Sequence, residues 1–447
     1  MPRTPEIPVF KKEEVDYFQS ALGKYREPGA YEPGKWMVSH LNRRADVLQG
    51  TFPAEVTLRD ITVRTTEQMP GVVLPPDDRL RLLRAVVESG VPSIQIGAFG
   101  RGRELDQIKS DIKLIKDINP KCEVVYGGLR SKEDIDLANE TGIDSVQFWS
   151  APYVEAAAMF SDVYRKAWNG EDWRSDLNLP KNVDDQIQRV APLVAHGNAS
   201  GVRVSVGLNQ ISFAPEDYVI TYSQAMHQIA APEIMLYDGG SGMGPEAYGH
   251  MVGLVRKHAP NTIIGVHTHN MFDLAVATAM ASAKAGASVL EVSVNGYCSA
   301  SGQADLAATA LTLDALYGVK TGIALETLTP LARLAEEIVG YKVAWNNPVT
   351  GREVFNWGGT EFVIQELKVD PLIHWCIEPS LVGNERRWDI TFDSGPYTML
   401  DKLIELEINV DLQFVEPILQ AVKEEMQKLR RVLDDDEIHD LVQKITN

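Results

Sequence analysis

The chain has 447 residues, an apolar fraction of 44% and a formal net charge of −19 at pH 7. This length exceeds one ordinary core and suits a large domain with an appendage. The acidic balance argues against a nucleic-acid surface, which needs clustered Lys and Arg, although a small anionic substrate needs only a local basic pocket. No apolar stretch is long enough for a membrane helix, and the polar N-terminus and three separated cysteines predict a cytoplasmic protein.

The chain divides into three predicted parts. Residues 1–50 lack clean periodicity and are expected to form an N-terminal arm. Over residues 51–320, short β-branched or apolar runs alternate with helix-length segments, which predicts a (β/α)8 TIM barrel. The predicted strands lie at 54–64, 91–97, 122–128, 144–149, 202–208, 233–240, 262–269 and 288–296. Residues 321–447 are predicted to be a C-terminal, mainly helical subdomain.

An open doubly wound sheet would show the same alternation, but no glycine-rich GxGxxG turn follows the first predicted strand. The segment between the fourth and fifth strands, roughly 151–200, is long enough to form a loop over the barrel mouth. The barrel is therefore the predicted fold, and its functional groups are expected at the C-terminal ends of the strands.

The seventh predicted strand ends in His267 and His269. Alternate residues of a strand point the same way, so both imidazoles can face one point above the barrel mouth. Two such histidines suit a divalent metal with partners from other strands. The alternative is that one or both only form hydrogen bonds in the core.

Other polar residues follow the first, fifth and eighth strands. Arg64 can hold a carboxylate or stabilise an enolate oxygen, or it can pair with a Glu and hold the loop. Glu216 can be a general base or simply an acidic residue in the first turn of a helix. Cys298 can be an acid–base thiol or an ordinary loop cysteine.

These segments together resemble the family of isopropylmalate synthase, homocitrate synthase and hydroxymethylglutaryl-CoA lyase. Residues 60–71 resemble the signature DTTLRDGEQxPG, 267–271 resemble HxHND, 129–138 resemble LxRxxxxDIxxA, and 295–303 resemble NGxGERxGN. Beyond the barrel, NNPVTGREVF and EPSLVGNERRWDITFDSG resemble the subdomain of the synthases. The resemblance runs from about residue 54 to the end of the chain, and the subdomain favours the synthases over the shorter lyases.

The resemblance also implies roles for particular residues. Those implied to be catalytic are Arg64, Glu67, Glu216, His267 and His269. Those implied to bind substrate are Thr65, Gln68, Gln95, Asn295, Cys298 and Gln303. The implied metal ligands are His267 and His269, and acyl-CoA is the implied co-substrate.

The departures from the family pattern concern the metal. Thr65 replaces the metal-binding Asp, and Gln95, Met271 and Gln303 replace a Glu, an Asp and an Asn. The family's subdomain histidine is also missing, since residues 357–362 read WGGTEF. Hard divalent cations prefer anionic oxygen ligands, so Mg²⁺ or Mn²⁺ should bind weakly. The histidines leave a softer site for Zn²⁺ or a similar ion, or no metal at all.

Three functions remain open at this stage. The first is an acyltransferase that condenses an acyl-CoA with a 2-oxo acid. The second is an aldol-type lyase on the same barrel, and the third is a non-catalytic paralogue that binds a ligand. The retained subdomain favours the first, whereas the altered metal shell favours the other two. A homodimer is expected because the helical appendage carries much apolar surface.

Overall fold

The computed structural model describes residues 11–100, 103–149, 164–172 and 183–446. The chain forms two compact units. Residues 41–343 make one, and residues 1–40 join 344–447 in the other. The predicted domain boundaries at residues 50 and 320 stay predictions. None of the helices in the described ranges is long and apolar enough to cross a membrane.

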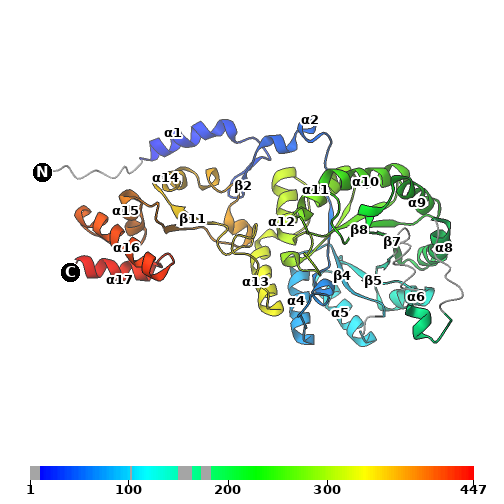
Figure 1. The fold of residues 1–447 in the computed structure, drawn as a ribbon. Helices are drawn as coiled ribbons and strands as arrows, with labels where there is room; N and C mark the ends of the chain where they lie inside the picture. Colours follow the sequence, from blue (N-terminus) through cyan, green and yellow to red (C-terminus); the bar gives the residue numbers. More distant parts are fainter. Residues whose placement is uncertain (1–10, 101–102, 150–163, 173–182, 447) are drawn as a thin grey trace. The chain divides into compact units, whose positions relative to one another are not determined.

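The larger unit is the predicted barrel. In the described residues, eight parallel strands close on themselves in chain order, and helices surround them (Figure 1). The strands are β3 Thr57–Asp60, β4 Ser93–Ala98, β5 Glu123–Gly127, β6 Ser145–Phe148, β7 Arg203–Asn209, β8 Glu233–Asp238, β9 Ile263–Thr268 and β10 Val289–Val292. Each of the eight runs predicted from the sequence overlaps one of these strands, and the runs 91–97 and 202–208 end one residue before their strands do.

The helices of this unit follow the strands as a (β/α)8 barrel requires. They are α2 Ala45–Leu48, α3 Thr62–Thr66, α4 Pro76–Glu88, α5 Leu105–Ile118, α6 Lys132–Thr141, α8 Val183–Ser200, α9 Glu216–Gln228, α10 Pro245–His258, α11 Ala275–Ala285, α12 Leu306–Leu311 and α13 Leu328–Val339. Of the predicted loop over the mouth, residues 183–200 form α8, and most of the remainder lies outside the described residues.

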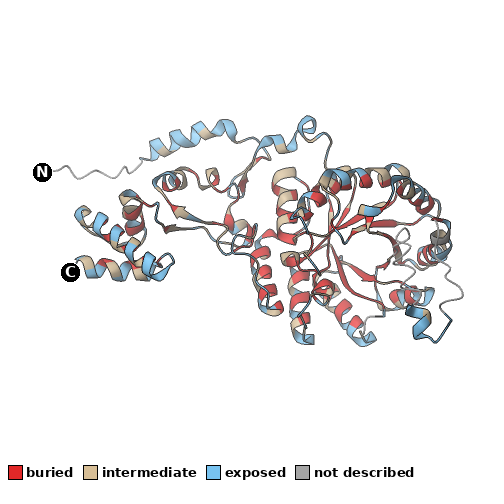
Figure 2. Cartoon of the chain, in the orientation of Figure 1, coloured by how far each residue is buried: buried red, intermediate tan, exposed pale blue. Residues whose placement is uncertain are grey.

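The strands are buried on both faces, and Figure 2 shows them among the most buried parts of the barrel. Their outward positions, such as Leu58, Ile94 and Ile264, are apolar and fully buried. Several inward positions are polar instead. Among them, Arg59 pairs across the barrel with Glu233, and Gln147 donates a hydrogen bond to Glu291. The helix-facing layer therefore supplies the hydrophobic core, while much of the interior is a hydrogen-bonded network.

The first predicted strand is shorter than expected. It ends at Asp60, and residues 62–66 form the short helix α3. The Asp60 carboxylate accepts hydrogen bonds from the backbone N–H and the hydroxyl of Thr62, at 2.9 and 2.7 Å. An acidic side chain that receives the first free N–H groups favours the start of a helix. Arg64 therefore stands on a helical turn just beyond the strand.

The smaller unit combines the two ends of the chain. Its elements are α1 Lys12–Leu22, β1 Tyr31–Glu32, β2 Trp36–Met37, β11 Asn356–Gly359, α14 Glu361–Val369, β12 Arg387–Ile390, α15 Pro396–Glu405, α16 Val415–Leu429 and α17 Asp435–Thr446. The N-terminal arm joins the C-terminal part through backbone hydrogen bonds from Met37 to Cys376 and from Glu378 to Lys35. The last three helices share one apolar core that includes Met399, Ile418 and Val442.

Candidate functional site

A row of four side chains crosses neighbouring strands inside the barrel. Tyr237 pairs in register with His267, His267 with Glu291, and Glu291 with Arg59. Since side chains at paired positions of neighbouring strands share a face, the row continues from β8 through β9 and β10 to β3. The register of the barrel therefore brings a phenol, an imidazole, a carboxylate and a guanidinium together.

The base of this arrangement is a buried ion-pair network. Arg59 is fully buried and donates to both carboxylate oxygens of Glu233, at 2.6 and 3.1 Å, and to Glu123 at 3.3 Å. Burial alone would lower the pKa of Arg59, but the carboxylates of Glu233, Glu123 and Glu291 raise it well above its ordinary value. A buried charge needs such partners, so the network holds the side chains of Arg59 and its carboxylate partners in place inside the barrel.

His267 is held in one orientation by its neighbours. Its Nδ1 lies 2.8 Å from Oε2 of Glu291, and Oε1 of Glu291 accepts from Gln147 at 2.7 Å. Gln147 in turn accepts a hydrogen bond from Gln95. Burial would lower the pKa of His267, but contacts with Cys298 and Glu291 raise it to about 9. Because Glu291 contacts Nδ1, the second imidazole nitrogen, Nε2, remains available to other groups at the barrel mouth.

A cluster of metal-ligating groups lies at this mouth. His267, His269 and Cys298 each offer one ligand atom, and these atoms lie within 4.8 Å of one another. The rings of His267 and His269 have centroids 4.9 Å apart. Burial would raise the pKa of Cys298, but hydrogen bonding to His267 and His269 lowers it to about 5. At neutral pH the metal-free site therefore holds a thiolate beside the protonated ring of His267.

Arg64 reaches the same region from α3. Its guanidinium carbon lies 4.8 Å from the centroid of the Trp149 ring, which follows β6. The Trp149 indole N–H donates to Gln147 at 3.3 Å, so Arg64 is connected through Trp149 and Gln147 to the Glu291–His267 pair. A stacked guanidinium is held in place while its edge can still donate hydrogen bonds.

The predicted substrate-binding residues divide into two groups. Gln303 pairs with His269 in an isolated β-bridge and is 2% exposed, and neither polar atom of its amide has a hydrogen-bond partner. Thr65 is buried, and its hydroxyl bonds to the Tyr297 carbonyl at 2.8 Å and to that of Ile61 at 2.9 Å. Gln303 is thus available to a ligand, whereas Thr65 ties α3 to the loop after β10.

Other predicted site residues form contacts with residues outside the His267, His269 and Cys298 cluster. Glu67 contacts Arg103 and Arg79, and its side chain is 37% exposed. Glu216 at the start of α9 bonds to His250 of α10 at 3.0 Å, with both side chains more than half exposed. The amide nitrogen of Asn295 donates to the Ala332 carbonyl at 3.0 Å. Gln68 is half-buried beyond the end of α3. Glu67, Glu216 and Asn295 therefore contact partners other than the two histidines.

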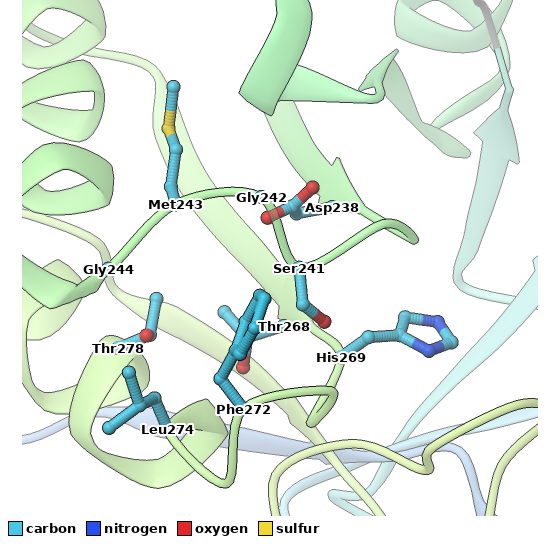
Figure 3. Close-up of a pocket in the computed structure, with 10 residues that line it drawn as sticks. All are labelled: Asp238, Ser241, Gly242, Met243, Gly244, Thr268, His269, Phe272, Leu274 and Thr278. Carbon is cyan, nitrogen blue, oxygen red and sulfur yellow. The ribbon is translucent and has the colours of Figure 1, made fainter.

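A small pocket of about 70 Å³ adjoins the cluster between the ends of β8 and β9 (Figure 3). Asp238, Ser241 and Thr268 line it, with the His269 imidazole at one edge. Asp238 is 2% exposed, and its Oδ1 has no hydrogen-bond partner. Met271, which stands where the family has an acid, is 58% exposed. The pocket therefore offers polar groups beside the histidines.

Sequence reasoning missed Tyr237 and Glu291. Each is a polar residue that follows an apolar one in its strand, Tyr237 after Leu236 in EIMLYD of β8 and Glu291 after Leu290 in VLEV of β10. This is the signal that could have identified them, because outward positions of a barrel strand are apolar. The Tyr237 hydroxyl has no hydrogen-bond partner, and burial raises its pKa well above the ordinary value. Tyr237 therefore presents a neutral phenol 5.5 Å, centroid to centroid, from His267.

The amino-acid sequence is similar to one family model and to several synthases. Residues 55–335 match the model of the HMGL-like family. The 2-phosphonomethylmalate synthase of Streptomyces rubellomurinus is 31% identical over 76% of this chain and 85% of its own length. The 2-isopropylmalate synthase of Sulfolobus acidocaldarius is 25% identical over 83% of this chain and 90% of its own.

Solved structures support the fold. Hydroxymethylglutaryl-CoA lyase from Pseudomonas aeruginosa superposes with a TM-score of 0.52 at 18% identity, over 65% of this chain and 95% of that one. At this identity the likeness concerns the barrel alone. The family match, by contrast, spans more than half of the sequence and contains every strand of the barrel. The chain therefore belongs to the HMGL-like family.

Proposed function

We propose that the barrel mouth condenses an acyl-CoA with a 2-oxo acid, as the names of the synthase relatives suggest for those proteins. The observation that carries this proposal is that Tyr237 lies beside His267 and Gln303 lies across a β-bridge from His269, within an HMGL-like barrel in which Arg64 lies over Trp149. Each of these groups can donate a hydrogen bond to an oxygen that becomes negatively charged during condensation. The subdomain resembling that of the synthases favours condensation over cleavage.

The reaction has three steps. A base takes a proton from the carbon next to the thioester of the acyl-CoA, and the resulting carbanion attacks the keto carbon of the 2-oxo acid. The new carbon–carbon bond turns the keto oxygen into an alkoxide, which takes up a proton to become a hydroxyl. Water then cleaves the thioester and releases CoA as a free thiol. Stabilisation of the enolate and alkoxide oxygens is where the protein can contribute most.

The residues have distinct parts in this scheme. Arg64, stacked on Trp149, donates to the developing oxygen or to the substrate carboxylate. Tyr237 has a protonated phenol without a partner, which suits it to donate to the alkoxide. The Gln303 amide can both donate to and accept from the oxo acid. Glu216, bonded to His250 away from the cluster, has no part in these contacts.

The hard divalent cation implied by the family resemblance does not fit these residues. The Thr65 hydroxyl is committed to backbone carbonyls, and the Gln95 amide to Gln147. The carboxylate of Glu291 is bonded to His267 and Gln147. Mg²⁺ and Mn²⁺ need several available oxygens, so no step above depends on such an ion.

A free-thiol assay tests the proposal. The purified protein is incubated with each of several acyl-CoAs, alone and with each of several 2-oxo acids, and released CoA is measured. We expect thiol release that requires both substrates in at least one combination. Release of CoA without an oxo acid would mean thioester hydrolysis. No CoA release with any pair of substrates would contradict condensation. Cleavage of a 3-hydroxyacyl-CoA into a shorter acyl-CoA and a carbonyl compound releases no thiol, and its detection by chromatography would instead support the lyase alternative.

We also propose a cytoplasmic homodimer. Within the smaller unit, Trp357, Phe362, Phe392 and Tyr397 are each about half exposed or more. Apolar rings gathered in one small unit are typical of a protein interface. Light scattering at micromolar concentration should therefore give twice the chain mass of 49.5 kDa. A mass equal to that of one chain would contradict the dimer.

A further inference from the structure

Three side chains at the barrel mouth can act as metal ligands, and none of the relatives' names refers to a metal site. His267, His269 and Cys298 supply two nitrogens and one sulfur, within 4.8 Å of one another. Tetrahedral Zn²⁺ has bonds of about 2.0–2.3 Å, which places its ligand atoms roughly 3.3–3.7 Å apart. Side-chain rotation covers the remaining distance. Among the described residues, no other trio of His, Cys, Asp and Glu meets the same criterion.

The surroundings of the cluster fit a metal centre. The Glu291 carboxylate, 2.8 Å from Nδ1 of His267, is the kind of partner that orients a metal-binding histidine and leaves Nε2 as the ligand. Glu291 is itself fixed by Gln147 at 2.7 Å. Nδ1 of His269 is buried without a hydrogen-bond partner. A buried polar atom of this kind needs a partner, which a bound ion or its coordinated water would provide.

The Gln303 side chain is a second, independent indication of a ligand. It is 2% exposed, lies across a β-bridge from His269, and has neither amide atom bonded. Leaving both atoms of a buried amide without partners costs free energy unless a ligand or water fills the space. The amide can hold whatever occupies the open position beside the histidines.

We propose that His267, His269 and Cys298 form a three-ligand site for Zn²⁺ or a similarly soft ion, with the fourth position open toward Gln303. Three protein ligands with an open fourth position are the pattern of catalytic zinc sites, and both His nitrogen and Cys sulfur are zinc ligands. The soft sulfur replaces the oxygen ligands of a hard-cation site, which accounts for the absence of an acid at Thr65. Any catalytic role of this ion rests on the proposed function, whereas its binding does not.

Cobalt spectroscopy on the full-length protein tests the sulfur ligand. Metal-free protein is titrated with Co²⁺, and we expect a thiolate-to-cobalt charge-transfer band at one ion per chain. Cys298→Ser should lose this band, while Cys376→Ser, which alters an exposed cysteine in the other unit, should keep it. Circular dichroism establishes that each variant is folded. A missing band in the unmodified chain, or its persistence in folded Cys298→Ser, overturns the proposal.

A competition experiment gives a second readout that does not depend on Cys298 variants folding. Zn²⁺ should bind the unmodified chain far more tightly than Mn²⁺, and Glu291→Gln should weaken Zn²⁺ binding about 10–100-fold. Equal affinity for Zn²⁺ and Mn²⁺ would contradict a sulfur-containing site. Neither measurement uses a substrate, so a negative thiol-release screen would overturn the proposed function and leave the metal site standing.

Discussion

Oε2 of Glu291 lies 2.8 Å from Nδ1 of His267, and Oε1 of the same carboxylate lies 3.8 Å from the Arg59 guanidinium. One side chain thus links the buried ion-pair network of the barrel interior to the imidazole at the mouth. Arg59 of β3 is fully buried, and its partners are anchored in β5, β8 and β10. The position of His267 is therefore set by four strands, which is the preorganisation that catalysis requires.

Arg64→Ala should lower kcat about 10²–10³-fold, because removing a preorganised donor from a developing oxyanion has this effect. The stability of the protein should change little. Arg64→Lys keeps the charge but loses the planar stack on Trp149, so we expect an intermediate rate. Steady-state kinetics and thermal unfolding of both variants provide the check. Activity lost together with several degrees of melting temperature would show that Arg64 only holds the loop.

Tyr237→Phe removes the phenol oxygen and leaves the ring, which packs closely on Gly207. We expect turnover to fall roughly 5–150-fold, the value of one to three kcal/mol of hydrogen bonding. The melting temperature should stay level or rise, since the lost hydroxyl is buried without a partner. Unchanged turnover would remove Tyr237 from the site. A large drop in stability would mean that the hydroxyl has a structural partner.

Asp60 should make stability depend on pH in an unusual direction. Burial raises its pKa from 3.8 to about 7, against the hydrogen bonds from Thr62 that lower it. The folded state then binds this proton more tightly than the unfolded state, so the contribution of Asp60 to stability is greatest below about pH 4 and falls as pH rises to 7. Relative to Asp60→Asn, the unmodified chain should lose roughly 1.4 kcal/mol of unfolding free energy per pH unit in this window.

Urea unfolding of the Asp60→Asn pair at pH 5, 6 and 7 measures this difference. Other titrating groups are common to both proteins and cancel when the two free energies are subtracted. A difference that stays constant across the three pH values would show that the carboxyl of Asp60 is ionised throughout, as the two hydrogen bonds from Thr62 alone would favour.

Thr65→Asp should create a binding site for Mn²⁺ that the unmodified chain lacks. The new carboxylate would face the carbonyls of Tyr297 and Ile61, which now receive the Thr65 hydroxyl. The variant should therefore be less stable without metal and be stabilised by Mn²⁺, by about 2.7 kcal/mol at 100 times the Kd. Thermal unfolding with and without Mn²⁺ tests this. Tight Mn²⁺ binding to the unmodified protein would contradict it.

The fold could be predicted from the sequence because its signal is repeated. Eight apolar runs at regular spacing leave few architectures open, and each run overlaps a strand of the barrel. The start of α3 was not predicted, because hydrogen bonds from Thr62 to the Asp60 carboxylate turn the chain against the β-branched composition of residues 61–66. Local hydrogen bonds of this kind carry no periodic pattern.

The site was only partly predictable for a related reason. His267 and His269 stand two residues apart on one strand, so their common direction follows from strand geometry. Cys298 comes to them through the fold of the loop after β10, which spacing alone does not specify. Glu216 shows the opposite case. It follows the end of a strand, as a catalytic residue would, but the first turn of α9 directs it toward His250.

The central claim is that two substrates are joined at this mouth. The direct test incubates the protein with an acyl-CoA carrying ¹³C in its acyl group and with the 2-oxo acid found in the thiol-release screen, then analyses the product by mass spectrometry. We predict one hydroxy acid that contains the labelled acyl carbons and the whole oxo acid, formed in equal amount to the released CoA, and suppressed by Arg64→Ala. Labelled free carboxylic acid in place of the joined product would contradict the account.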